Sequence, residues 1–527
     1  NYAQRSGRAG RSGQPALVTT YCSTGSSHDQ YFFRRPTLMV SGQVNPPRLD
    51  LANEDLVRAH VYAIWLSEAG LDLKNSLKDI LEHSGDHPTL ALNASVANDV
   101  KDPAPRARAK ARSAAVLRLI EGELNDSDWW SATWLDETLN AVGLRFEQAC
   151  ERWRTLFRAA QAQRNTQNAI IGDASRLQRD KEQAVRLRAE AEAQLRLLTN
   201  DDAGRFQSDF YSYRYFASEG FLPGYNFPRL PLSAFIPARR RRSGDSDDFL
   251  SRPRFLAIAE FGPRSFVYHE GSRYVINRVI LPVADDQAGD ARPVRTASAK
   301  QCGSCGYMHP LEGDATVDMC RLCGNELGNA MTNLFKMQNV SARRTERINS
   351  DEEERARKGY ELRTGVEFAD VGGRPSYRVA TASTAGRDLA QLTYGERATL
   401  WRINLGWARR DPTTGPGFRL DVERGYWQTG PDDTDPEDPM SPRMETVVPF
   451  VNDRRNALVV RPTKLAAIPD DRNRLAVAAA LQAALKNAIQ IVFNLEDGEL
   501  AAEPLPSRSD ARLILLYEAS EGGAGVL

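Results

Sequence analysis

The segment Cys302-Gly-Ser-Cys305, followed after fourteen residues by Cys320-Arg-Leu-Cys323, is the most specific chemical pattern in this chain. Each C-x-x-C pair lets two thiolates turn toward one point, and the glycine after each pair permits a tight turn. Four thiolates form a closed tetrahedral Zn2+ site without an open position for water, so the metal would be structural rather than catalytic. The spacing therefore predicts a zinc ribbon over 301–330, with these four cysteines as the ligands.

Two alternatives compete with ligation by four cysteines. Redox-active pairs share the C-x-x-C spacing, but two pairs at ribbon spacing disfavour a redox role. His309 lies in the loop between the pairs and could replace one thiolate. We interpret Cys22 and Cys150 as ordinary buried thiols. Six cysteines in 527 residues do not make a disulfide scaffold, so a reducing cytoplasm is the expected location.

Length and composition indicate a soluble protein of three or four domains. The chain has 527 residues, 41% of them hydrophobic and 26% charged. Sixty-nine basic residues balance sixty-nine acidic ones, so any nucleic-acid site must be a local basic groove. No apolar run reaches the ~18 residues of a membrane span, and no signal peptide opens the chain, so we expect no membrane partner.

The N-terminal sequence Gln4-Arg5-Ser-Gly-Arg8-Ala-Gly-Arg11 is the second specific pattern. On a helix Gln4, Arg8 and Arg11 share one face, because they are spaced by four and then three residues. Nothing acidic lies nearby in the sequence to pair with these cations. A triphosphate held by a neighbouring domain would explain them, since arginines neutralise the charge that develops on the γ-phosphoryl group. A basic helix that binds phosphate for another purpose is the alternative.

This pattern resembles motif VI of superfamily 2 helicases, at the end of the second RecA-like domain. The resemblance implies that Arg8 and Arg11 are catalytic contacts to the ATP phosphates, and that Gln4 and Arg5 belong to the ATP-binding cleft. The sequence has no G-x-x-x-x-G-K-[ST] loop, so we expect that the chain cannot hydrolyse ATP alone. Because Asn1 replaces an initiator Met, we expect a piece of a longer chain, with ATP and Mg2+ bound mainly by an upstream domain.

Beyond this motif, the sequence predicts a helical region followed by a β-rich region. Asn53 is a plausible N-cap for the first helix, and helices are expected at about 53–70, 73–83, 107–124 and 128–142. The charge-rich stretch 144–198 has one glycine and no proline, which favours a helical hairpin or a kinked long helix. Its arginines are consistent with a solvent-exposed helical strut. A surface that follows the phosphates of a nucleic-acid backbone is the more specific alternative. Later strands are expected near 361–370, 376–381, 399–405, 417–421, 445–450 and 511–517, with a helix over 474–492.

Three segments leave alternatives open. The aromatic residues of Phe210–Phe216 could stack on bases of a single strand, but packing into a core is the favoured interpretation. The basic run Arg239–Arg242 is interpreted as a surface loop that could touch a nucleic-acid backbone. The acidic segment Pro431–Pro439 is interpreted as a solvated loop, and a flap that mimics nucleic acid is the alternative.

Several stretches together resemble one group of superfamily 2 helicases, which carry a four-cysteine zinc module and a C-terminal helicase-associated domain of unknown function. MrfA-type DNA repair helicases belong to this group, and the DrmA-type helicase subunits of the bacterial DISARM anti-phage system are more similar. Besides motif VI and the four cysteines, the stretches are Asn45–Asp50, Asn53–His60, Ala217–Pro228 and Tyr517–Leu527.

The resemblance implies a multidomain α/β and α+β protein that moves on DNA, including single-stranded DNA, at the expense of ATP. Its partner would be an accessory DISARM subunit with a related C-terminal domain. The predicted parts are the end of the second RecA-like domain (1–47), a helical domain (48–143), a long helical hairpin or strut (144–200), the first part of a β-rich domain (201–300), the zinc module (301–330) and a C-terminal helicase-associated α+β domain (331–527).

Two alternatives to a defence helicase remain open. One is a DNA repair helicase of the MrfA type, and the other is a non-enzymatic, zinc-stabilised scaffold that binds DNA or a partner. The C-terminal sequence Glu518-Ala-Ser-Glu521-Gly-Gly-Ala-Gly525 has no adjacent His or Lys, so we assign it a structural turn rather than catalysis.

Overall fold

The structure is a computed structural model of the whole chain. It describes all residues except 1–14, 42–49, 86–87, 201–208, 225–228, 238–246, 283–293, 312–316, 346–358, 372, 412, 429–437, 439, 494, 497, 520–522 and 524. The predicted ATP-cleft residues Gln4, Arg5, Arg8 and Arg11 therefore lie outside the described residues. So do the basic run 239–242, Glu521 and the acidic segment 431–439 apart from Asp438.

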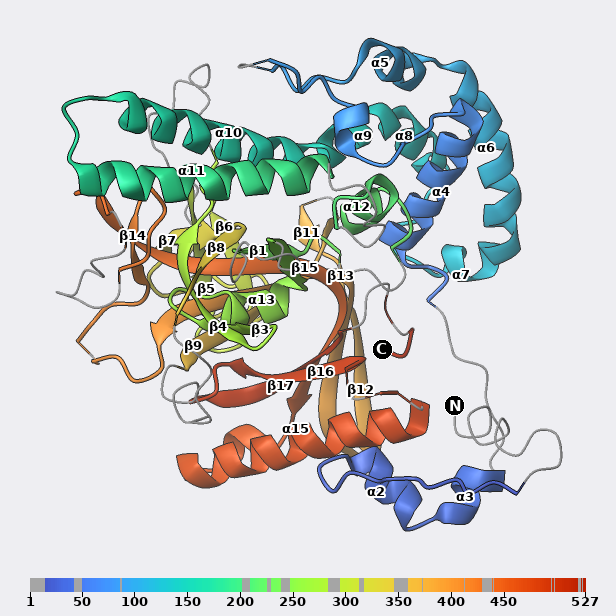
Figure 1. Cartoon of the computed structure of the whole chain (residues 1–527). Coiled ribbons are helices and arrows are strands. Elements are labelled where there is room, and N and C mark those ends of the chain that lie inside the picture. The colour runs from blue at the N-terminus through green and yellow to red at the C-terminus, as the bar shows by residue number, and fades with distance from the viewer. Residues whose placement is uncertain are drawn as a thin grey trace. The chain divides into compact units, whose positions relative to one another are not determined.

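The chain forms a mixed α/β structure of two compact units (Figure 1). Unit 1 comprises residues 1–50, 368–398 and 455–527, and unit 2 comprises residues 51–367 and 399–454. Two long strands, β13 (Arg387–Trp407) and β15 (Met444–Pro462), contribute residues to both units.

Unit 2 begins with a helical region. Its first helix, α4 (Glu54–Ala69), is capped as predicted, because the Asn53 side chain accepts a hydrogen bond from the Leu56 N–H at 3.0 Å. The helix expected over 73–83 was wrong, since only the 3-10 turn Leu77–Asp79 forms there. The other helices are α5 (Ala94–Lys101), α6 (Ala104–Leu117), α7 (Glu121–Asn125), α8 (Trp134–Asn140) and α9 (Val142–Ala149), with a 3-10 turn at Arg118–Ile120.

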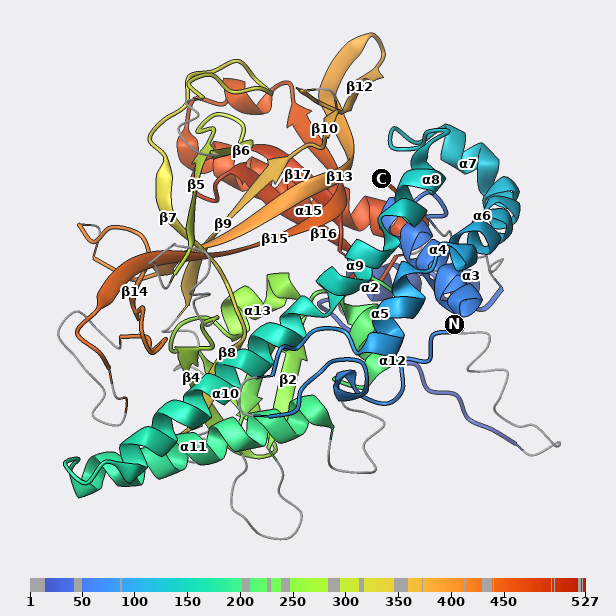
Figure 2. The ribbon, with the colours of Figure 1, turned by 90° about the horizontal axis from the view of Figure 1, so that it is seen from above.

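The long helical stretch is a hairpin rather than a kinked helix. Helices α10 (Glu151–Gly172) and α11 (Gln178–Thr199) pack along each other (Figures 1 and 2). Several of their arginines are already neutralised, which supports the strut interpretation over a phosphate-tracking surface. The ion pairs are Arg152–Glu219, Arg154–Glu147, Arg158–Glu151, Arg176–Asp173 and Arg188–Glu192.

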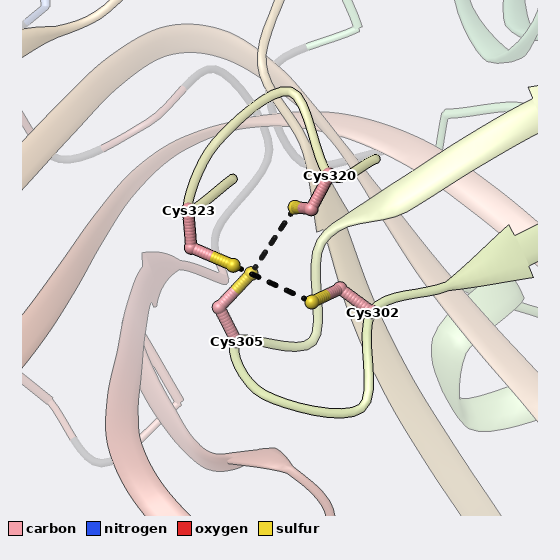
Figure 3. A group of neighbouring side chains, drawn as sticks. All are labelled: Cys302, Cys305, Cys320 and Cys323. Atoms are coloured by element: carbon pink, nitrogen blue, oxygen red, sulfur yellow. Dashed lines mark hydrogen bonds between the residues drawn. The ribbon is translucent and has the colours of Figure 1, made fainter. Parts of the chain in front are cut away.

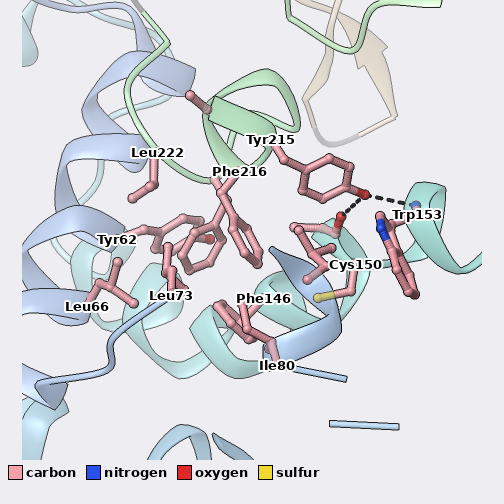
Figure 4. Close-up of a cluster of buried hydrophobic side chains, with 14 of the residues drawn as sticks. Tyr62, Leu66, Leu73, Ile80, Phe146, Cys150, Trp153, Tyr215, Phe216 and Leu222 are labelled. Carbon is pink, nitrogen blue, oxygen red and sulfur yellow. Dashed lines mark hydrogen bonds between the residues drawn. The ribbon is translucent and has the colours of Figure 1, made fainter. Parts of the chain in front are cut away.

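The aromatic segment after the hairpin packs into the core, as the favoured interpretation predicts. Helix α12 (Ser212–Ser218) places Tyr215 and Phe216 in the helical core, both fully buried (Figure 4). The Tyr215 hydroxyl donates to the Ala149 carbonyl at 2.8 Å and accepts from the Trp153 N–H at 2.9 Å (Figure 4). Cys150 is buried in the same core, as expected, whereas Cys22 in unit 1 is only half-buried.

Two groups of strands complete unit 2. A five-stranded sheet has the order β2-β1-β8-β4-β3, and helix α13 (Arg254–Glu260) follows β2. Its strands are β1 (Leu232–Ile236), β2 (Asp248–Arg252), β3 (Phe266–His269), β4 (Ser272–Val279) and β8 (Val340–Arg344). In the second group β7 pairs with β5 and in parallel with β15, β14 pairs with β15, and β9 pairs with β13. These strands are β5 (Thr296–Gln301), β6 (Met308–Leu311), β7 (Met331–Lys336), β9 (Tyr360–Glu367) and β14 (Phe418–Asp421).

Unit 1 is built on antiparallel strands. Here β12 pairs with β13, β15 pairs with β17, and β17 pairs with β16. The elements are α2 (Ser27–Phe33), α3 (Pro36–Ser41), β10 (Asp370–Val371), β11 (Arg374–Pro375), β12 (Arg378–Thr384), a 3-10 turn (Leu465–Ala467), α15 (Asp471–Phe493), β16 (Leu500–Pro506) and β17 (Ala511–Glu518).

Helix α15 departs from one sequence expectation. By length and composition alone it could cross a membrane, with a mean hydropathy of 1.5 over its most apolar window. A search for an uninterrupted apolar run misses it because Gln482 and Lys486 divide the run. In unit 1 the helix packs on β16 and β17, and Leu481, Leu485 and Ile489 contact the core there. Only 11% of that window is buried, so α15 is not the mostly buried core helix that also passes this test; a single such helix is weak evidence of a membrane span.

Candidate metal centre

The four predicted ligands lie on two tight backbone turns. The first joins β5 to β6, where Gln301 pairs with Met308 in an antiparallel ladder. The Gly306 N–H donates to the Cys302 carbonyl at 2.9 Å, and Gly306 has a φ of +75°. Only glycine adopts this left-handed conformation without strain, which explains the residue that follows Cys305.

The second turn repeats the geometry of the first. The Gly324 N–H donates to the Cys320 carbonyl at 2.9 Å, and Gly324 has a φ of +73°. The Cys320 N–H donates to the Asn325 carbonyl at 2.8 Å, and a bridge joins Met319 to Glu326. Each turn therefore carries two cysteines in the same local backbone geometry.

The two turns bring the four sulfur atoms together. All four Sγ atoms lie within 4.8 Å of one another, and the side chains point toward one another (Figure 3). The Cys302 and Cys323 sulfurs are 3.5 Å apart, and those of Cys305 and Cys320 are 3.6 Å apart. A tetrahedral zinc site with Zn–S bonds of about 2.3 Å has sulfur–sulfur edges of about 3.8 Å. The sulfur positions are thus compatible with a structural Zn2+ ion.

Burial and hydrogen bonding also fit a closed metal site. Cys302, Cys305 and Cys320 are buried, and Cys323 is half-buried. The hydrogen bond between Cys305 and Cys320 lowers the pKa of the Cys320 thiol and raises the pKa of the Cys305 thiol. Without a metal, thiols this close together therefore lose their protons at different pH values. A divalent cation at their centre would favour the thiolate form of all four.

His309 lies beside the cluster but is not one of the grouped ligands. Among the described residues only the four cysteines have ligand atoms close enough to one another to share an ion. His309 is buried on β6, next to the ring of Tyr307, and its proximity contributes to the lowered pKa of the Cys320 thiol. The geometry favours the all-cysteine set over the alternative in which His309 replaces a thiolate.

The cysteine module is attached to strand β9. The Gln301 side-chain amide donates to the Thr364 carbonyl at 3.0 Å, and a parallel bridge joins Tyr307 to Val366. A methyl group on Gly365 would collide with the Met308 side chain, so β9 approaches this closely only with glycine there. The sequence analysis did not single out Gly365, because a lone glycine in a strand gives no signal of what approaches it.

Glu518, at the start of the C-terminal segment, makes several contacts within unit 1. The Glu518 carboxylate is buried and accepts hydrogen bonds from the N–H groups of Val526 at 2.8 Å and Leu527 at 3.3 Å. The Asn456 side chain donates to Glu518 at 3.4 Å and to Asp50 at 3.1 Å. Each of these partners is a protein group, as expected of a side chain that closes a turn.

Comparison with known proteins adds two partial similarities. No family model matches the chain. The crystal structure of the DUF1998 helicase MrfA bound to DNA aligns with 56% of this chain and 27% of that chain, at 8% identity and a TM-score of 0.25. A likeness this weak carries no argument about fold or function.

The other similarity is local in sequence. Over 64 residues the chain is 41% identical to the Druantia protein DruE of Escherichia coli (strain UMEA 4076-1), which is 12% of this chain and 3% of DruE. The chain thus matches only a small part of the length of either protein.

Proposed function

We propose that this chain is the C-terminal part of an ATP-dependent DNA helicase or translocase. The observation that carries the proposal is the spacing of Gln4, Arg8 and Arg11, which on a helix would put one amide and two guanidinium groups on a single face. No acidic residue lies nearby in the sequence to pair with these cations, and an anion from elsewhere would explain them. The resemblance to motif VI of superfamily 2 helicases identifies that anion as the triphosphate of ATP.

The roles of the motif follow from the chemistry of phosphoryl transfer. Arg8 and Arg11 stabilise the negative charge that develops on the γ-phosphoryl group, because guanidinium groups bind phosphate oxygens in a bidentate manner. Gln4 and Arg5 contact the nucleotide at the same cleft. ATP and Mg2+ are bound mainly by an upstream domain that supplies the phosphate-binding loop.

The four-cysteine module has a structural role in this proposal. Zn2+ bound by Cys302, Cys305, Cys320 and Cys323 has no free coordination position, so it holds the two turns together without taking part in a reaction. Its support is the sulfur geometry and the repeated left-handed glycine at Gly306 and Gly324.

The proposed setting is bacterial anti-phage defence of the DISARM type, in the cytoplasm, with an accessory subunit that has a related C-terminal domain. This part of the proposal rests on the pattern of motifs along the chain. The local similarity to a Druantia protein is compatible with it. A DNA repair helicase of the MrfA type is the second candidate, supported by the four-cysteine module, which that group also carries.

ATP turnover tests the proposal directly. The intact protein is assayed with and without single-stranded and duplex DNA, beside Arg11→Ala and the control Arg34→Ala, which alters an exposed arginine outside the motif. We expect turnover that DNA stimulates, that is lost in Arg11→Ala and that is kept in Arg34→Ala. An intact protein that binds DNA but turns over no ATP would instead be a zinc-stabilised scaffold.

A further inference from the structure

Three cations of unit 2 form no close ion pair with any carboxylate that the structure describes. They are Arg254 at the start of α13, Lys336 at the end of β7 and Arg454 on β15. Among the residues that the structure describes, no carboxylate oxygen lies within 4.0 Å of their charged groups. Lys336 and Arg454 are exposed, and Arg254 is partly buried. Other cations in the described part of unit 2, among them Arg164 and Lys181, also form no ion pair, so these three are set apart by their position in the fold.

The strand register brings these residues together from distant parts of the sequence. Lys336 lies opposite Phe450 in the parallel pairing of β7 with β15, and the Met337 N–H donates to the Phe450 carbonyl at 2.9 Å. The Arg254 guanidinium donates to the Leu230 carbonyl at 2.6 Å and reaches the Asn452 carbonyl at 3.4 Å. Arg254 therefore contacts β15 between the position of Lys336 and that of Arg454.

Carboxylates also lie near these cations: Asp453 and Glu219 act on Arg254, and the charge of Arg454 helps to lower the pKa of Asp55. Although Lys336 is exposed overall, partial desolvation of its ammonium group lowers its pKa, and the charge of Arg254 lowers it further. Burial likewise lowers the pKa of Arg254; Asp453 and Glu219 oppose this effect, whereas Arg152 and Arg229 add to it. Arg152 and Arg229 are themselves paired with Glu219 and Asp55, so those carboxylates are shared already.

A fourth cation and an aromatic ring border the group. Phe255 follows Arg254, and the Arg402 guanidinium lies 5.6 Å from the centre of the Phe255 ring. This contact places a planar cation against the residue that follows Arg254. Arg254, Lys336, Arg454 and Arg402 are four cations of unit 2, in a chain whose formal net charge is zero.

We propose that Arg254, Lys336 and Arg454 form a binding surface for the phosphodiester backbone of DNA. Phe450 is the residue opposite Lys336, and Arg454 lies four positions further along β15. This offset corresponds to a distance of ~13 Å along a strand. This separation favours contacts with successive phosphates over a single small anion, since one DNA strand presents a charge about every 3.4 Å along its axis. The inference rests on the proposed function, and it adds the place where unit 2 meets the DNA.

The salt dependence of DNA binding tests the surface. The intact protein is titrated against a fluorescent single-stranded oligonucleotide at several salt concentrations, with Lys336→Gln, Arg454→Gln and the double variant. Each phosphate contact contributes about 0.7 to the slope of log K against log salt for single strands. We expect each single variant to lower the slope by about that amount and to weaken binding of unrelated sequences equally.

The chain provides matched controls. Lys74 is exposed and paired with Asp72 at 2.6 Å, and Arg112 is exposed and paired with Glu68 at 2.8 Å. Lys74→Gln and Arg112→Gln remove the same charges elsewhere on unit 2 and should leave the slope unchanged. Arg254 is left intact because it also holds two backbone carbonyls.

The outcomes separate this inference from the proposed function. Wild-type slopes in Lys336→Gln and Arg454→Gln, with DNA binding intact, overturn the surface and leave the motor standing. Reduced slopes in a protein without DNA-stimulated ATP turnover support the surface and overturn the motor. A protein that binds no DNA at any salt concentration overturns both.

Discussion

The Asp438 carboxylate lies 2.7 Å from the Arg264 guanidinium, and both side chains are almost completely inaccessible to solvent, at 0% and 5% exposed. The Asn277 side-chain amide donates to the same carboxylate at 2.8 Å. Asp438 belongs to the acidic segment that the sequence analysis interpreted as a solvated loop. For this residue the interpretation was wrong, because its charge is neutralised by a buried cation rather than by water.

Asp438→Asn should therefore destabilise the protein strongly. The variant leaves Arg264 buried without its anionic partner, and breaking a buried ion pair in this way costs about 3–5 kcal/mol. The free energy of unfolding of unit 2, measured by chemical denaturation, should fall by that amount. The control Asp72→Asn breaks an exposed pair with Lys74 and should change the free energy of unfolding far less, because solvent screens that pair. Equal effects of the two substitutions would contradict this account.

Removing one thiol of the metal centre should remove the metal. Cys302→Ser and Cys320→Ser each leave three sulfur ligands, so the purified variants should lose the single equivalent of zinc and much of their soluble yield. Metal content is measured by atomic emission. Cys22→Ser, which alters a half-buried cysteine outside the cluster, should retain full zinc. Full metal retention in Cys302→Ser would disprove the zinc assignment.

Stability at acidic pH should depend on Asp55. Burial alone would raise its pKa, but the charge of Arg229 and their hydrogen bond, with Arg58 and Arg454, lower it from 3.8 to about 2. A lowered carboxyl pKa adds stability that is complete above pH 4 and is lost as the pH falls toward 2. The shift corresponds to roughly 2 kcal/mol.

The comparison of wild type with Asp55→Asn isolates that contribution. The difference in urea midpoint between the two proteins should be constant above pH 4 and should shrink between pH 4 and pH 2. Other carboxylates titrate in both proteins, so their effect cancels in the difference. A difference that stays constant down to pH 2 would show that Arg229 does not hold Asp55 in its charged form.

The C-terminal turn should loosen when its buried carboxylate is removed. Glu518→Ala leaves the N–H groups of Val526 and Leu527 without their acceptor, so hydrogen exchange of these two amides should accelerate. Gly523→Ala should have a similar effect, since its φ is +76° and a methyl group there would collide with Glu518. The exposed control Glu496→Ala should leave both exchange rates unchanged.

Local patterns in the sequence predicted the parts of the structure that depend on neighbouring residues. The C-x-x-C spacing identified all four clustered cysteines, because each of the two turns is formed by six consecutive residues. The cap at Asn53 was also predictable, because a capping side chain binds a backbone N–H three residues later. The segment 73–83 failed because its apolar residues Leu73, Leu77 and Leu81 are buried by tertiary packing without a regular helix.

Long-range pairing explains what the sequence could not reveal. Arg254, Lys336 and Arg454 are scattered over two hundred residues, and only the parallel pairing of β7 with β15 and the reach of Arg254 bring them together. The length of β13, 21 residues, was also missed, because its partners β12 and β9 pair with different parts of it. No periodicity within one strand records which strand lies beside it.

The attachment of the cysteine module to β9 has a consequence for the protein in the cell. A metal that binds the folded module and not the unfolded chain adds a free energy of RT ln(1 + [Zn]/Kd), about 1.4 kcal/mol for each tenfold rise in free zinc above Kd. Thr364 and Val366 of β9 contact the module directly. Zinc binding would therefore also stabilise β9, which lies about sixty residues further along the chain. When free zinc is scarce, a larger fraction of the protein would be unfolded and open to proteolysis. Zinc supply would then affect the steady-state abundance of the protein.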